Sequence, residues 1–267
     1  MKIFFNKKNK EEFSKNGYVI LKNVISKKKA LMLKKQVISL NKLEEIKIQS
    51  NNYKFDTYRF DKNNKRVWNL INKSNEFRKL IQNKHVNKFM EWIFDRKTPH
   101  QKYFLSSFHA NILVPGCLKQ KLHIDTPVPE PLPDWPIKAN SIWMLDDFTI
   151  LNGSTEVVPR SHKLKFKPKK KDNNIKKIIK CTGTAGSVII THGALWHRSG
   201  ENLSKESRVA LLGSFAASYA MEIASEENHS KIIDKFTLKK ASPFLKKILG
   251  TGHGLKEGSR IIPNNRS

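Results

Sequence analysis

Apolar residues recur at helical spacing through most of the first hundred residues. An amphipathic pattern with a period near 3.6 residues is typical of helices that pack one face on a core. It predicts helices at 9–15, from 27 to about 43, at 66–70 and from about 74 to 94. Residues 18–21 form a short apolar run that favours a strand.

From residue 103 the pattern changes to short runs of strand-forming residues separated by turns. Many short strands with Pro, Gly and Asn between them indicate a double-sheet jelly roll. The predicted strands are 103–109, 110–114, 120–124, 141–145, 154–158, 175–180, 187–191 and 208–215. We therefore expect an α+β chain with a mainly β core, a cupin-like double-stranded β-helix braced by the N-terminal helices.

The length of 267 residues fits one large domain. We divide it into a helical support (1–100), the jelly-roll core (101–220) and a C-terminal part (221–267) with helices at about 226–236 and 243–249. Two cysteines form no disulfide framework or zinc cluster. No window resembles a signal peptide or a membrane span, so we expect a cytoplasmic protein without a membrane partner.

The net charge of +28 raises the alternative of a basic nucleic-acid-binding protein. The excess is mostly lysine and is scattered along the chain. The densest run, 163–180, contains only Phe166 as an aromatic, whereas proteins that bind single strands interleave stacking aromatics with basic residues. We interpret this run as a solvated loop and predict no specific nucleic-acid partner, with an anion-binding patch as the alternative.

His123 and Asp125 are the strongest chemical signal in the chain. Side chains at i and i+2 of an extended segment point to the same side, so both can bind one ion. His197 is a plausible third ligand far downstream. Two histidines and one carboxylate form the facial triad of non-haem Fe(II) oxygenases, which leaves coordination positions open. The other histidines, including His109 and His162, are interpreted as structural or surface residues.

Longer motifs surround these residues. They are Gln120–Asp125, Asn140–Thr149, Asn152–His162, Trp196–Asn202 and the single Arg208, with weaker similarity at 16–19, 66–70 and 249–250. With these motifs the chain resembles the phytanoyl-CoA dioxygenase family of Fe(II)- and 2-oxoglutarate-dependent oxygenases. The family couples oxidative decarboxylation of 2-oxoglutarate, which yields succinate and CO2, to oxidation of a substrate C–H bond by O2.

The resemblance implies that His123, Asp125 and His197 bind Fe(II), and that Arg208 forms a salt bridge with the distal carboxylate of 2-oxoglutarate. It implies no further catalytic residue beyond the metal centre. His192 is a rival to His197, but the residue eleven positions after His192 is a leucine, whereas His197 leads to Arg208.

Three further residues, Gln120, Thr155 and Trp143, occupy positions where family members line the cosubstrate pocket. The carboxylate Asp125 is present, whereas related halogenases carry a small residue there, so the resemblance favours hydroxylation. The segment 126–137 and the lysine-rich loop after His162 are the expected walls of the substrate pocket.

Arg160 departs from the family pattern, because most relatives have glycine between the proline and the serine. Glycine would permit a positive φ angle, so arginine suggests a different turn or a cation at the cavity rim. Arg160 and Arg198 near the motifs hint at an anionic small-molecule substrate. Asp146 and Asp147 are interpreted as strand-end and turn contacts. A non-catalytic jelly-roll binding protein remains the other alternative.

Overall fold

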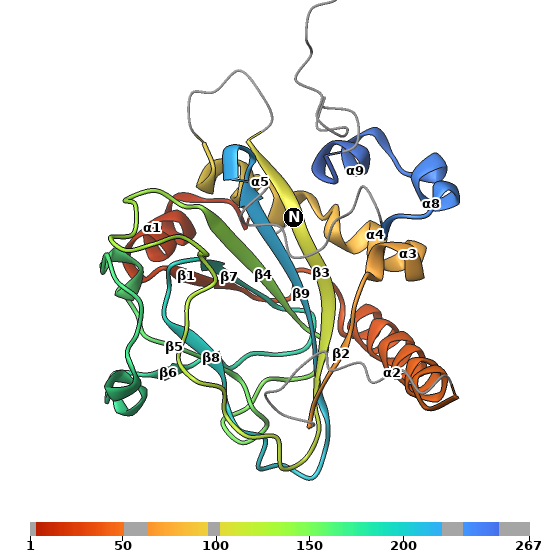
Figure 1. Ribbon diagram of the computed structural model, residues 1–267, viewed down its shortest axis with the longest axis horizontal. Helices are drawn as coiled ribbons and strands as arrows, with labels where there is room; N and C mark the ends of the chain where they lie inside the picture. The colour runs from red at the N-terminus through yellow and green to blue at the C-terminus, as the bar shows by residue number, and fades with distance from the viewer. Residues whose placement is uncertain (1–3, 51–62, 96–101, 221–231, 251–267) are drawn as a thin grey trace, which may run out of the picture.

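The computed structural model describes residues 4–50, 63–95, 102–220 and 232–250. In these ranges two antiparallel sheets face each other, one of six strands in the order β1-β7-β4-β9-β3-β2 and one of three in the order β6-β5-β8 (Figure 1). The strands are β1 (Tyr18–Leu21), β2 (Asn64–Val67), β3 (Tyr103–Leu113), β4 (Lys138–Met144), β5 (Thr155–Val157), β6 (Ile179–Lys180), β7 (Val188–His192), β8 (His197–Ser199) and β9 (Arg208–Ala217). The predicted jelly roll is confirmed.

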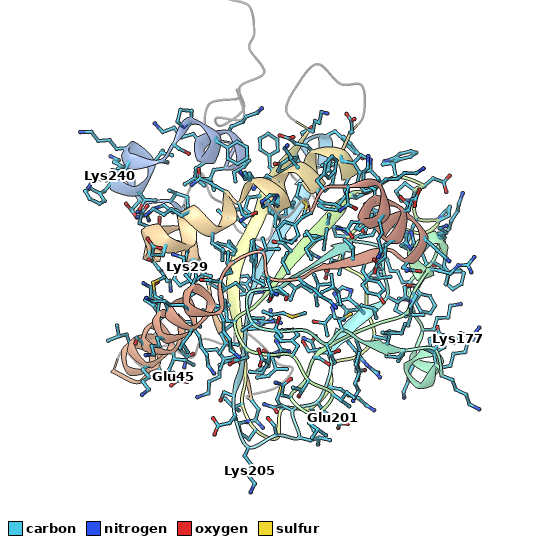
Figure 2. The ribbon with its side chains drawn as sticks, turned by 180° about the vertical axis from the view of Figure 1, so that it is seen from behind. Lys29, Glu45, Lys177, Glu201, Lys205 and Lys240 are labelled. Carbon is cyan, nitrogen blue, oxygen red and sulfur yellow. The ribbon has the colours of Figure 1, made fainter. Side chains whose placement is uncertain are left out.

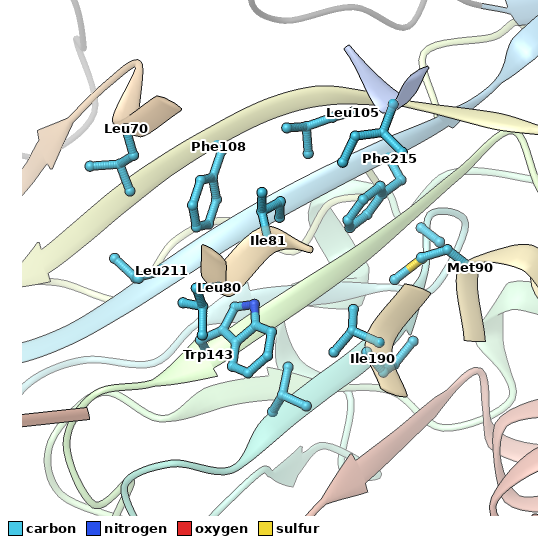
Figure 3. Packing of buried hydrophobic residues seen from close by; sticks show 14 of the residues in the cluster. Leu70, Leu80, Ile81, Met90, Leu105, Phe108, Trp143, Ile190, Leu211 and Phe215 are labelled. Carbon is cyan, nitrogen blue, oxygen red and sulfur yellow. The ribbon is translucent and has the colours of Figure 1, made fainter. Parts of the chain in front are cut away.

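The helices lie outside the jelly roll, and several of them cover the outer face of the large sheet (Figure 1). They are α1 (Lys7–Asn16), α2 (Lys27–Ser50), α3 (Leu70–Lys73), α4 (Asn75–Ile81), α5 (Lys84–Ile93), α8 (Lys235–Lys240) and α9 (Pro243–Ile248), with short 3-10 turns at Ser161–Lys163, Lys170–Asn174 and Ser218–Ala220. Figure 3 shows Leu80, Ile81 and Met90 of α4 and α5 packed near Phe108 and Phe215 of the sheet. Helical bracing of one sheet is therefore as expected.

The large sheet is buried on both faces, which sets the direction of each side chain along its strands. Leu211 and Phe215 of β9 join the core beneath the helices, whereas Ala210 joins a second cluster inside the jelly roll. That inner cluster also contains Ile142 and Val157, from β4 and β5. Because side chains alternate along a strand, every second residue of β3, β4 and β9 points into the jelly roll.

Two helical predictions are wrong. Arg66 and Val67, predicted as helical, belong to β2, in which Val67 pairs with Ala110 of β3. The helix expected from 74 to 94 is broken into α4 and α5 at Asn83, whose side chain accepts hydrogen bonds from two backbone N–H groups of α5. An N-cap residue in the middle of an apolar stripe starts a new helix even when the helical spacing of apolar residues continues.

The strand predictions also change in detail. The two runs expected at 103–109 and 110–114 form the single strand β3, with an irregularity between Leu105 and Ser107. The run 120–124 is not a strand and makes only an isolated bridge between His123 and His197. Strand β8 was not predicted. The expected helix 226–236 lies mostly outside the described residues, and α8 spans Lys235–Lys240.

In Figure 2, Lys29, Lys177, Lys205 and Lys240 lie at separate places on the molecule. Lysines are therefore spread over the structure as they are spread along the sequence. No helix in the described ranges has the length and apolar composition needed to cross a bilayer.

Candidate metal centre

The three predicted ligands converge. His123 lies in the extended segment after β3, and His197 begins β8. The backbone N–H of each donates to the carbonyl of the other, at 3.0 and 2.9 Å, which places both imidazoles on one side. Ligand atoms of His123, Asp125 and His197 lie within 4.8 Å of one another. The structure therefore brings together residues separated by more than seventy positions.

Both imidazoles are oriented by backbone carbonyls. His123 Nδ1 lies 2.8 Å from the carbonyl oxygen of Lys121, and His197 Nδ1 lies 2.9 Å from that of Leu195. An Nδ1–H that donates to a carbonyl leaves the lone pair on Nε2, the atom that would bind a metal. His197 Nε2 is 3.2 Å from Asp125 Oδ2, and His123 Nε2 is 3.8 Å from Oδ1.

Asp125 is held from two directions. The side-chain amide of Asn140, on the inner face of β4, donates to Asp125 Oδ2 at 2.6 Å. The carbonyl of Gly193, after β7, accepts from the backbone N–H of Asp125 at 2.8 Å. A side chain at Gly193 would not fit, because a Cβ there would lie 2.6 Å from the carbonyl oxygen of Lys138. Neither Asn140 nor Gly193 was assigned a role from the sequence.

The charges of the triad suit a divalent cation. Burial alone would raise the pKa of Asp125, but His197, His123 and Lys138 outweigh it and hold the pKa well below its usual range. Burial lowers the pKa of His123, and the neighbouring His197 lowers it further. The pKa of His197 is raised because Asp125 outweighs the effect of burial. An ionised carboxylate beside two imidazoles is a donor set that Fe(II) accepts.

Arg208 begins β9 and is only 2% exposed. Its Nη2 donates to the carbonyl of Gly153, and its Cζ lies 4.4 Å from the centroid of the Phe148 ring. Burial lowers its pKa to about 10. Its Nε has no hydrogen-bond partner, and no carboxylate pairs with it in the described part of the chain. The nearby Asp146 is already engaged by Lys34 at 2.6 Å.

A buried guanidinium without a counter-ion is unfavourable, and the anionic end of a ligand would compensate it. The arginine fork matches a carboxylate through two parallel hydrogen bonds. Arg208 therefore fits the role expected of it, the binding of a dicarboxylate's distal end.

Gln120 and Thr155 lie beside the strand that carries His197. The backbone N–H of Ser199 donates to Gln120 Oε1 at 3.0 Å, which leaves the amide nitrogen of Gln120 as the group it can offer to a ligand. Thr155 pairs with Ser199 across β5 and β8, and Val157 pairs with His197 in the same register. Because directly paired side chains share a face, Thr155 points inward with His197.

The structure does not bring Trp143 to the triad. It lies three positions after Asn140 on β4, and its fully buried ring belongs to the core beneath the helices, near Leu80 and Leu211 (Figure 3). Residues three apart on a strand face opposite ways. The indole is therefore separated from Asp125 by the sheet itself.

Sequence reasoning missed a polar stripe inside the jelly roll. His109 and Asn111 of β3 and Ser214 of β9 each have a buried side-chain atom without a hydrogen-bond partner. Burial lowers the pKa of His109 to about 3, and its ring lies tilted against the Trp68 ring with 4.2 Å between centroids. Polar residues at every second position of an otherwise apolar strand were the available signal, because such a stripe marks a face that meets polar ligands or water.

The structure excludes one of the two alternatives given for Arg160, and Arg198 differs from expectation. Arg160 does not form a different turn: its φ of 71° is the left-handed conformation that glycine would adopt, and its side chain is exposed. Arg198 is buried, and its Nε lies 2.7 Å from Glu156 Oε2. Since Arg198 alternates with His197 along β8, it faces away from the triad and its charge is already balanced.

Asp146 and Asp147 have the contacts that the sequence indicated. Asp146 accepts a hydrogen bond from the backbone N–H of Val209, at the start of β9, and Asp147 accepts one from Ala185. These hydrogen bonds connect the end of β4 to neighbouring segments.

Replacing Asn140 with leucine is expected to weaken binding of Co(II) about 10- to 100-fold, because partners that orient a metal ligand typically contribute that much. Anaerobic calorimetric titration measures the affinity. The matched control is Thr191→Val, which removes only the 3.4 Å contact between Thr191 and Asn140 and should leave the affinity within about threefold. Equal losses in both variants would contradict the role given to Asn140.

Replacing Arg160 with glycine is expected to raise the free energy of unfolding by about 1 kcal/mol, because glycine adopts a positive φ without steric conflict. Urea denaturation measures the change. Arg160→Ala keeps the conflict while removing the same side chain, so it should give no gain. A gain in the alanine variant would show that the side chain, and not the backbone, is responsible.

The sequence was compared with family models and curated proteins. Residues 13–210 match the model described as phytanoyl-CoA dioxygenase (PhyH). Dioxygenase af480 of Aspergillus fumigatus is 33% identical over 150 residues, 56% of this chain and 48% of that protein. Dioxygenase FUM3 of Gibberella moniliformis is 28% identical over 201 residues, 70% of this chain and 63% of that protein. The matched part of the chain thus spans 48% to 63% of the length of these two relatives.

Solved structures resemble the fold. HygX from Streptomyces hygroscopicus, with nickel, 2-oxoglutarate and hygromycin B bound, superposes with a TM-score of 0.63 at 13% identity, over 80% of this chain and 88% of that one. The carbocyclase SnoK from nogalamycin biosynthesis gives a TM-score of 0.59 at 16% identity, over 79% and 84%. With the family model matched across the triad and Arg208, the chain belongs to the phytanoyl-CoA dioxygenase family.

Proposed function

We propose that the protein is an Fe(II)- and 2-oxoglutarate-dependent dioxygenase that hydroxylates a C–H bond of a small molecule and releases succinate and CO2. The observation that carries this proposal is the pairing of two features: three converged metal ligands, and a buried arginine at the start of β9 that has no counter-ion among the described residues. A metal site alone would be compatible with many functions. The additional buried cation fits a cosubstrate with a second carboxylate.

Each residue has a defined role in this proposal. His123, Asp125 and His197 would hold the iron on one face, and Arg208 would anchor the far end of 2-oxoglutarate. Bound iron and 2-oxoglutarate supply the oxidising chemistry through O2. The protein orients the ligands through backbone carbonyls and Asn140.

Several observations support the cosubstrate site. Gln120 and Thr155 lie next to β8 and are proposed to line it. The unpartnered polar atoms of Asn111 and Ser214 add hydrogen-bonding groups inside the jelly roll. Trp143 is not part of this proposal. Relatives named as dioxygenases, and a structural neighbour that holds nickel and 2-oxoglutarate, are consistent with it.

An anionic substrate remains a proposal with narrower support. Arg198 no longer favours it, because Glu156 balances its charge. Lys138 acts electrostatically on Asp125, and Arg66 on His123, so positive potential does reach the triad from β4 and β2. The presence of Asp125 favours hydroxylation over halogenation.

We also propose a cytoplasmic location, consistent with two free, buried cysteines.

The test is a screen of small-molecule pools for succinate release that depends on Fe(II), 2-oxoglutarate and O2, with Arg208→Ala as the blank. Pools of anionic and neutral compounds are compared directly. We expect at least one pool to raise succinate release above the substrate-free rate in the native protein only. Metal and 2-oxoglutarate binding without succinate release from any pool would favour the non-catalytic binding protein.

A further inference from the structure

A cavity of about 570 Å3 lies away from the triad; it is called the second cavity to distinguish it from the metal site. Its walls come from α1, α5, the segment Pro133–Pro136 and the segment His162–Lys165, and His192 at the end of β7 contributes to it. None of the three metal ligands lines it. The volume is in the range of cavities that bind small molecules. The two loops expected to wall the substrate pocket therefore meet here, on the other side of β7.

The interior of this cavity is aromatic and uncharged. Phe13 and Trp92 pack edge to face with 5.8 Å between ring centroids, and the rings of His162 and His192 lie 5.3 Å apart. Burial lowers the pKa of His192 to about 3 and also lowers that of His162. Neutral imidazoles beside aromatic rings can hydrogen-bond a ligand while its flat apolar part stacks.

The rim of the cavity carries unbalanced positive charge. Lys165 Nζ lies 3.0 Å from Asp134, so these two charges balance each other. Lys163 is exposed at the same rim and pairs with no carboxylate in the described ranges. A ligand that complements this arrangement combines a planar apolar body with one negative charge.

The cavity is connected to the triad by one residue. His192 lines it, and the next residue, Gly193, accepts hydrogen bonds from the backbone N–H groups of Asp125 and Thr126 at 2.8 and 3.1 Å. The backbone N–H of Gly193 donates to Lys138 at 2.7 Å, and a side chain at this glycine would not fit. A ligand that shifts His192 would therefore shift the hydrogen bonds that position Asp125.

We propose that this cavity is an effector site for a small aromatic carboxylate, whose binding alters the metal affinity of the triad through Gly193. Binding in the cavity is independent of any oxygenase activity. Only the predicted effect of this binding on metal affinity depends on the metal site proposed above.

Binding can be measured by 19F NMR with 4-(trifluoromethyl)benzoate as the probe. The experiment uses both the metal-free protein and protein saturated with Ni(II) and 2-oxoglutarate, so that the triad is occupied in the second sample. We expect saturable binding in both. The uncharged analogue 4-(trifluoromethyl)benzamide should bind about fivefold more weakly, because an exposed ion pair contributes about 1 kcal/mol.

Two variants of α1 locate the probe. Ser14 is exposed and lines the cavity, so Ser14→Trp should fill the mouth and weaken binding at least about tenfold. Glu11 is exposed on the same helix but does not line the cavity, so Glu11→Trp should leave binding unchanged. Circular dichroism verifies that both variants fold. Displacement of the probe by 2-oxoglutarate, or equal binding to both variants, would overturn the proposal.

The linkage is tested by titrating Ni(II) with and without saturating probe. We expect the dissociation constant to change about threefold or more in the native protein and not in Ser14→Trp, in keeping with typical coupling energies between sites. An equal change in both proteins would mean that the probe acts on the metal directly. No change in the native protein would rule out the linkage.

Discussion

Replacing His197 with alanine is expected to abolish tight binding of a divalent metal, with a loss of affinity greater than about 100-fold. Partners that merely orient a ligand contribute 10- to 100-fold, so loss of a ligand itself should exceed that range. His197 also stabilises the ionised form of Asp125, from which its Nε2 lies 3.2 Å away. Anaerobic titration with Co(II), followed by calorimetry and by the visible spectrum, measures the effect.

His192→Ala is the matched control. His192 lies five positions earlier, is equally buried, and was the rival ligand on sequence grounds, but its ring faces the second cavity with His162. We expect this variant to retain Co(II) binding, with at most the small change in affinity that its link to Asp125 through Gly193 would produce. If His192→Ala lost the metal and His197→Ala retained it, the assignment of the triad would be wrong.

The metal ligands were predictable because their signal is local. His123 and Asp125 are two positions apart, and alternation along an extended chain fixes their common direction. The residues that hold these ligands in position are distant from them in the sequence. Asn140 reaches Asp125 only because β4 runs beside the ligand segment. Gly193 contributes because its carbonyl accepts from the backbone N–H of Asp125, and only glycine fits there because a Cβ would collide with the carbonyl of Lys138. Contacts of that kind depend on tertiary packing, which periodicity cannot specify.

Burial on both faces explains why the residue pattern could not show that Trp143, assigned by the family resemblance, faces the core beneath the helices. A strand that is apolar on one side and polar on the other reveals its direction, but β4 is buried throughout. The composition of β4 therefore could not show which alternate residues face the inside of the jelly roll. A shift of one residue assigns every side chain to the opposite face. Asn140 was the available clue: if that amide points to the triad, a residue three positions on cannot.

The environment of Arg208 could not be predicted from the sequence either. The motif identified the residue, but its lack of a counter-ion depends on Asp146 being taken by Lys34 of α2. Burial and isolation of a charge are properties of the packed molecule. They also make Arg208 different in kind from Arg198, which is buried to a similar degree but paired with Glu156.

Arg208→Met is expected to weaken 2-oxoglutarate binding about 100- to 1000-fold, because two charge-assisted hydrogen bonds contribute roughly 3–4 kcal/mol together. The same change should not destabilise the ligand-free protein. Removing a buried charge that has no counter-ion relieves a desolvation penalty, and this offsets the hydrogen bond lost at Gly153. Calorimetric titration of the Ni(II) form and urea denaturation of the metal-free form measure the two effects.

Arg198→Met provides the contrast, because it leaves Glu156 buried beside only a distant lysine, Lys180 at 3.9 Å. Breaking a buried pair by removing one partner typically costs about 3 kcal/mol or more. We therefore expect Arg198→Met to lower stability while Arg208→Met lowers cosubstrate affinity. A large loss of stability in Arg208→Met would mean that its guanidinium is a structural cation, and the assignment of the cosubstrate anchor would fail. Opposite behaviour of two equally buried arginines follows only if Arg208 is kept free for a ligand's carboxylate.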